Sequence, residues 1–133
     1  MKLRLGLLLL RIAAGTPMML HGLMKLTSGP TFWENLGGLP PMIPDIGWLK
    51  LTLGLIAALI EFAGGILVIA GYGVRCASIA IVLVMLIAFT YHIPNINSFN
   101  ALMYNTWPLE IGLVFAAIAV INPGRKLSPG ESN

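Results

Sequence analysis

Long apolar runs alternate with shorter polar segments along this chain, and the runs have about the length of membrane-crossing helices. A helix needs about 17–25 mainly apolar residues to cross the hydrocarbon core of a bilayer. The four runs extend over residues 3–26, 48–72, 75–93 and 106–121. The last run is the shortest, and its Pro108 fits the first turn of a helix. The pattern therefore predicts an all-α integral membrane protein with a four-helix bundle.

The first run begins like a secretory signal peptide, because Lys2 and Arg4 precede the apolar stretch LGLLLL. Arg11 then interrupts this stretch, and the apolar pattern resumes as far as Leu26. A cleaved leader has a short and uninterrupted apolar region, so we expect this segment to be retained as the first helix.

The segments between the runs are rich in turn-forming residues. Residues 28–48 contain four of the nine prolines and predict an irregular loop. Gly71, Tyr72 and Gly73 predict a tight turn, and residues 94–105 predict an uncharged, asparagine-rich loop. We expect residues 1–124 to form a single domain and residues 125–133 to be a disordered cytoplasmic tail.

The composition supports a membrane location. Of the 133 residues, 57% are hydrophobic and only 10% are charged, whereas about 25% are charged in an average soluble domain. The net charge of +3 fits cytoplasmic loops and does not suggest nucleic-acid binding. Cys76 is the single cysteine, which excludes an internal disulfide and a metal cluster held by several cysteines.

Lysine and arginine predict the orientation, since loops rich in these residues remain in the cytoplasm. Five of them fall on one side of the predicted spans and two on the other. The five are Lys2, Arg4, Arg75, Arg125 and Lys126, and the two are Lys25 and Lys50. Both termini are therefore expected in the cytoplasm.

Five ionisable side chains fall inside the predicted spans: Arg11, His21, Glu61, His92 and Glu110. A charge in the hydrocarbon costs about 2.5–3.5 kcal/mol on insertion scales, so such groups usually face the protein interior and pair with one another. On the second span Glu61 shares a face with small residues, which lets another helix approach closely. We therefore expect the face that carries Glu61 to be packed against other helices.

The depths of these residues predict one polar column. At about 1.5 Å per residue, Arg11 and Glu61 come out near the midplane and should form an ion pair. His21, His92 and Glu110 fall in the outer half and should form a cluster there. We expect proton transfer by His21, Glu61, His92 and Glu110, and substrate binding by Arg11, Lys25, Tyr91 and Tyr104.

Each residue of the column also has a purely structural explanation. An ion pair of Arg11 with Glu61 can specify helix packing, and His21 can hydrogen-bond a neighbouring helix. His92 can satisfy carbonyls at a helix end, Glu110 can complement a helix dipole, and Lys25 can extend to the membrane interface.

Two histidines and a carboxylate are also the ligand set of some metal sites. His21, His92 and Glu110 are a weak alternative of this kind, because no short motif fixes their spacing. The main expectation is a site without metal.

Several segments resemble the DoxX family of small four-helix bacterial membrane proteins. The resemblance extends from about Leu5 to Ser128 and rests on RIAAGTPMMLHGLMKL, NLGGLP, IEFAGGILVIAGYGVRCASIAIVLVM and WPLEIGLVFAAIAVINPGRKLS. Its most specific part is the HGxxKL element from His21 to Leu26, followed by LGGLP. The resemblance implies the four-helix fold, a multi-pass location in the bacterial inner membrane and a redox role, since some relatives are associated with quinone-linked sulfur oxidation or membrane oxidoreductase assemblies. It carries no set of catalytic residues.

Three functions agree with these features. The favoured one is a quinone-linked membrane oxidoreductase subunit, with a soluble or membrane-bound partner that supplies the other redox centre. The second is a non-enzymatic scaffold or assembly factor for a partner complex. The third is a proton or small-solute pathway, which would require a homo-oligomer because four short helices leave little room for a channel.

Overall fold

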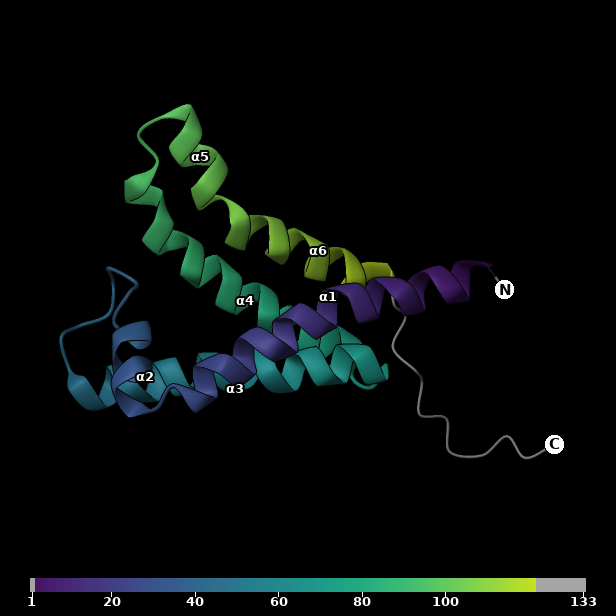
Figure 1. Cartoon of the computed structure of the whole chain (residues 1–133), viewed down its shortest axis with the longest axis horizontal. Helices are drawn as coiled ribbons and strands as arrows, with labels where there is room; N and C mark the ends of the chain where they lie inside the picture. Colours follow the sequence, from purple (N-terminus) through teal and green to yellow (C-terminus); the bar gives the residue numbers. More distant parts are fainter. Residues whose placement is uncertain (1, 122–133) are drawn as a thin grey trace.

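The computed structural model describes residues 2–121, with side chains from residue 5 onward, and this part of the chain is helical without any strand. The predicted tail, residues 125–133, lies outside the described residues. The described residues form six α-helices, and a short 3-10 turn, Ile93–Asn95, follows the fourth. Figure 1 shows how they are arranged. The helices are α1 (Lys2–Thr27), α2 (Pro30–Gly37), α3 (Gly47–Ala70), α4 (Val74–His92), α5 (Phe99–Asn105) and α6 (Trp107–Ile121).

Three helices, α1, α3 and α4, are long and apolar enough to cross a membrane. The fourth predicted span corresponds to α6, whose 15 residues extend only about 22 Å at about 1.5 Å per residue. It becomes a candidate span when it is combined with α5, to which it is joined at a bend of 46°. The prediction of an all-helical membrane protein is thus confirmed, with three candidate spans, or four if the bent pair is one span.

Two segments that were predicted as loops contain helices. Pro30 begins α2, because its fixed φ suits the first helical position and its missing N–H costs nothing there. Ser98 caps α5, and its hydroxyl accepts a hydrogen bond of 3.2 Å from the Ala101 N–H. The prediction of an irregular loop over residues 28–48 is therefore wrong for Pro30–Gly37.

Glycines bring α1 and α3 into backbone contact. A Cβ added at Gly15 would lie 2.9 Å from the Gly65 carbonyl oxygen, and one added at Gly22 would overlap the backbone of Phe62. The packed face of α3 is the small-residue face that carries Glu61, as predicted, whereas Leu59 on the opposite face is 45% exposed. The buried residues of this helix are Gly54, Ala58, Glu61, Gly64, Gly65 and Val68.

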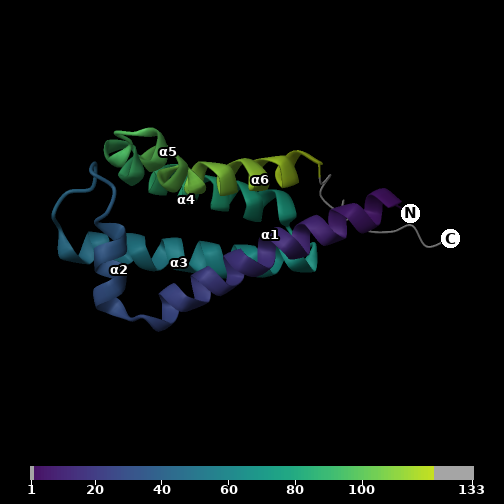
Figure 2. The same cartoon turned by 45° about the horizontal axis from the view of Figure 1, so that its top comes forward.

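The molecule consists of two helix pairs, α1 with α3 and α4 with α6, which Figure 2 shows as two layers. The tight turn predicted between α3 and α4 is present, and Gly71 and Gly73 have φ values of 77° and 56°. The α4–α6 pair shares one apolar core with Met18 of α1 and Val68 of α3. Its buried members are Met18, Val68, Val74, Ala77, Ile81, Met85, Phe115 and Ile118.

Candidate functional site: a polar-ended cavity between the helices

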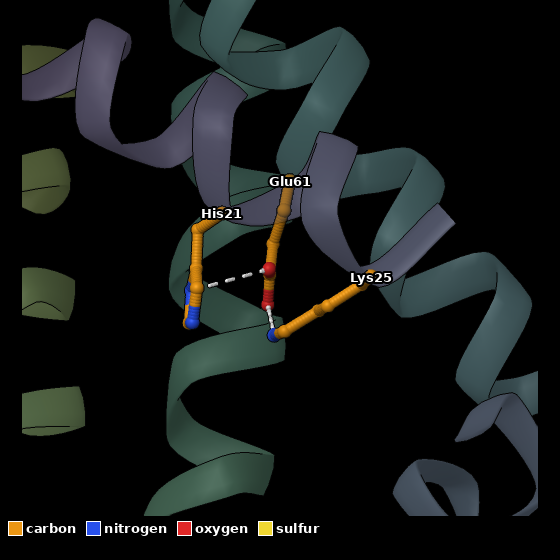
Figure 3. A network of polar contacts seen from close by, with 3 residues as sticks. All are labelled: His21, Lys25 and Glu61. Carbon is orange, nitrogen blue, oxygen red and sulfur yellow. Dashed lines mark hydrogen bonds and ion pairs between the residues drawn. The ribbon is translucent and has the colours of Figure 1, made fainter. Parts of the chain in front are cut away.

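Glu61 is the centre of the polar site. Its side chain is 1% exposed in the middle of α3, and its carboxylate faces two side chains from α1 (Figure 3). Lys25 Nζ donates a hydrogen bond of 2.6 Å to Glu61 Oε1, and His21 Nδ1 lies 3.7 Å from Glu61 Oε2. The buried carboxylate therefore has an ammonium group as its direct partner and an imidazole as a neighbour.

The helical period explains why two residues of α1 reach the same carboxylate. His21 and Lys25 are four residues apart, so their side chains lie one above the other on one face of the helix. Gly22, which lies between them, allows this face to approach the backbone of α3. The Trp33 indole of α2 donates a hydrogen bond of 2.8 Å to the Lys25 carbonyl and so attaches α2 to the end of α1.

Only one of the two oxygens of the Glu61 carboxylate has a hydrogen-bond partner among the described residues. Within the described part of the chain Glu61 Oε2 is buried and has no hydrogen-bond partner, because 3.7 Å to His21 Nδ1 is too long for a hydrogen bond. A buried acceptor without a donor costs about 1–3 kcal/mol. Within the described residues, His21 Nδ1 is the titratable nitrogen that lies near this oxygen.

A cavity of about 450 Å³ adjoins this carboxylate. The polar side chains of its lining are His21, Lys25, Glu61, Tyr91 and His92. The rest of its lining is apolar and comes from α2, the segment after it, α3, α4 and the indole at the start of α6. These residues are Leu36, Gly37, Leu39, Pro40, Ile43, Leu53, Gly54, Ile56, Ala57, Ile60, Ala80, Leu83, Val84, Ile87, Ala88 and Trp107. A small ligand with a polar head and an apolar body matches this division.

His92 is held by Asn105. The Asn105 amide nitrogen donates a hydrogen bond of 2.8 Å to the Ala101 carbonyl, which leaves Asn105 Oδ1 as the acceptor toward His92 Nδ1, 2.9 Å away. His92 Nδ1 therefore carries a proton and donates it, so Nε2 of the neutral ring is free to accept one.

Trp107 separates the two histidines. Its ring is edge-on to His21, with 6.2 Å between ring centroids, and edge-on to His92, with 5.7 Å. Trp107 was not predicted as a site residue. Trp107 resembles an ordinary interfacial tryptophan in the sequence, and only the packing of α6 beside α4 reveals its position between the histidines.

The predicted ion pair between Arg11 and Glu61 is not formed. The Arg11 guanidinium lies beside Gly71 at the end of α3, where a Cβ on that glycine would be 2.5 Å from Arg11 Nη1. The carboxylate is occupied by Lys25 instead. The reason is the register of α1 on α3, in which Arg11 lies opposite a residue ten positions beyond Glu61.

Glu110 and Tyr104 also lie outside the cavity lining. Glu110 is exposed and accepts a hydrogen bond of 2.9 Å from the Thr106 hydroxyl, and Tyr104 is 80% exposed. Glu110 lines a separate cleft of about 830 Å³ between α1 and α6, whose lining also includes His21 and Trp107. The predicted cluster of His21, His92 and Glu110 is thus divided between two spaces.

The same division removes the metal alternative. Within residues 2–121 no group of three or more His, Cys, Asp or Glu side chains is placed to hold a metal ion. His21, His92 and Glu110 accordingly do not form a three-ligand set. Five of the eight predicted site residues line the cavity, namely His21, Lys25, Glu61, Tyr91 and His92.

These features define a helical membrane protein with a titratable site buried between its helices. The DoxX family model matches residues 6–93, which is more than half of the chain, and the protein belongs to the DoxX family. The matched region contains α1 to α4 and every ionisable residue of the cavity, whereas Trp107 and α6 follow it. No curated protein and no solved structure matches the chain significantly.

Proposed function

We propose that this protein binds a quinone in the cavity and takes part in quinone-linked electron transfer in the bacterial inner membrane, with both termini in the cytoplasm. The observation that carries the proposal is the cavity of about 450 Å³, whose lining combines a few ionisable side chains with many apolar ones. A quinone has two carbonyl oxygens on opposite sides of its ring, so a site for it needs polar groups around the head and an apolar slot for the rest of the molecule.

The polar residues of the lining can form hydrogen bonds and exchange protons with such a head group. Lys25 is a donor within the site, and His21 is close enough to exchange a proton with Glu61 after a small rotation. The unpaired Glu61 Oε2 would accept a hydrogen bond from a hydroxyl group, which a quinol has and a quinone lacks. His92, with Nδ1 fixed by Asn105, would present Nε2 as a second acceptor in the cavity lining.

When bound, a quinone supplies reversible two-electron, two-proton chemistry. The residues of this chain would bind and orient the head, exclude bulk water and carry protons between Glu61, His21 and the cleft beside α6. The electrons would come from a separate redox protein, soluble or membrane-bound, which is a partner that this proposal requires.

The test is to extract small molecules from protein purified in a mild detergent and to quantify quinone by mass spectrometry. We expect near-stoichiometric quinone in the wild type. When the protein is purified under reducing conditions, so that the bound molecule is the quinol, retention should fall about tenfold or more in Glu61→Gln and in His21→Ala, because losing a hydrogen bond to a charged group costs about 1.5–3 kcal/mol. Glu110→Gln is the matched control, since this residue lines the other cleft, and its quinone content should be unchanged.

Circular dichroism and gel filtration would show whether each variant is folded. Lipid without quinone in well-folded wild-type protein would contradict the proposal and favour the alternative of a scaffold for a partner complex. Equal quinone content in the wild type and in both site variants would contradict the placement of the head group at Glu61.

A further inference from the structure

The apolar part of the cavity adjoins a second apolar space. A shallow groove of about 280 Å³ lies between α3 and α4, and it shares Ile56, Ile60 and Ala80 with the cavity. The remaining lining residues of the groove carry no polar side chain. They are Leu59, Ala63, Gly64, Leu67 and Ala77.

Small residues create this groove. Ala63, Gly64, Ala77 and Ala80 leave a depression between the two helices, although the helices touch beneath it, where a Cβ at Gly64 would lie 3.0 Å from Ile81 Cδ1. Leu59, beside the depression, is 45% exposed. The groove is thus open along its length and leads from the region of Glu61 toward the α3–α4 turn.

We infer that the site takes a quinone with a long polyprenyl tail, whose tail leaves the cavity through the α3–α4 groove while its head lies at Glu61. This inference rests on the proposed function and adds the substrate class and the path of the tail. Continuity between groove and cavity at three shared residues supplies the connection that such a molecule requires.

The other opening is less suitable for a tail. The cleft between α1 and α6 meets the cavity at His21 and Trp107, and Glu110 lies in its lining. Lipid chains are as apolar as leucine, so a tail gains nothing from leaving lipid as such, and packing and the absence of polar groups decide its path. The α1–α6 cleft, with an ionisable residue on either side, is instead suited to proton exchange with the site.

Photo-crosslinking locates the tail directly. The probe is a benzoquinone with a decyl tail that carries a diazirine at its end, added to purified protein in nanodiscs. We expect labelled peptides from residues 56–67 and 77–80, and we expect excess unlabelled decylbenzoquinone to suppress the labelling. Suppressible labelling of α1 and α6 instead would overturn the inference but leave the proposed function intact. Labelling that no quinone suppresses would contradict the proposed function itself.

A substitution that fills the groove with a larger side chain provides a second test. Ala63 lines the groove but not the cavity, so Ala63→Phe should block the tail and leave the head site open. Affinity for a long-tailed quinone should fall at least about fivefold, as expected from the loss of several van der Waals contacts. Affinity for a tailless benzoquinone should not change.

Ala117→Phe is the matched control, because Ala117 is an exposed alanine of α6 that lines none of these spaces, and it should bind both quinones like the wild type. An Ala63→Phe variant that binds long-tailed and tailless quinones with the wild-type preference would overturn the inference.

Discussion

Lys25→Met is expected to destabilise the protein by about 3–5 kcal/mol, because it leaves the buried Glu61 carboxylate without its cation. Methionine has nearly the length of lysine, so packing against α3 is largely preserved and the loss reports the charge. The measurement is the free energy of unfolding from an SDS titration in mixed micelles, followed by tryptophan fluorescence and circular dichroism.

The double variant Lys25→Met/Glu61→Gln measures the coupling energy between the two side chains. Removing the carboxylate charge as well should recover most of the stability, since a buried ion pair replaced by neutral groups is often close to neutral overall. The two single changes should thus be strongly non-additive. Arg11→Met combined with Glu61→Gln is the matched control, and its effects should add because Arg11 lies beside Gly71. Coupling of Glu61 to Arg11 in place of Lys25 would contradict the site described here.

The sequence predicted that an ionisable residue of the first span pairs with Glu61. It indicated Arg11, whereas Lys25 forms the ion pair. Depth counted at about 1.5 Å per residue assumes that every helix crosses straight and starts at the same level. In the folded protein the glycines decide the register: Gly15 lies against Gly65, and Gly22 lies against Phe62. This antiparallel register places His21 and Lys25 at Glu61, and the contact pattern of the glycines would have indicated it.

Other parts of the site depend on tertiary packing that a single sequence does not encode visibly. Pro30 and Ser98 are local start signals for α2 and α5, and their significance could have been recognised. The position of Trp107 between His21 and His92 has no comparable signal, because it depends on how α6 packs beside α4. Likewise, only the packing of the helices shows that Glu110 lines the α1–α6 cleft and not the cavity.

Gly22→Ala is expected to destabilise the protein by about 3 kcal/mol or more, toward the upper end of the cost of overpacking. An added Cβ would meet the backbone of Phe62 and the Ala58 carbonyl oxygen, 2.9 Å away, and backbone atoms cannot rotate out of the way as a flexible side chain can. The helix α1 would have to move away from α3. That movement would also take His21 and Lys25 away from Glu61, so quinone retention should fall together with the free energy of unfolding.

Gly6→Ala is the matched control in the same helix, because nothing lies within 4 Å of a Cβ at that position. Alanine is a better helix former than glycine by about 0.5–1 kcal/mol, so this variant should be as stable as the wild type or slightly more stable. The opposite signs of the two Gly→Ala changes would show that helix contact, and not helix propensity, makes glycine necessary at position 22. If Gly22→Ala proved as stable as Gly6→Ala, then α1 would not pack on α3 at Phe62, and the register that brings Lys25 to Glu61 would have to be abandoned.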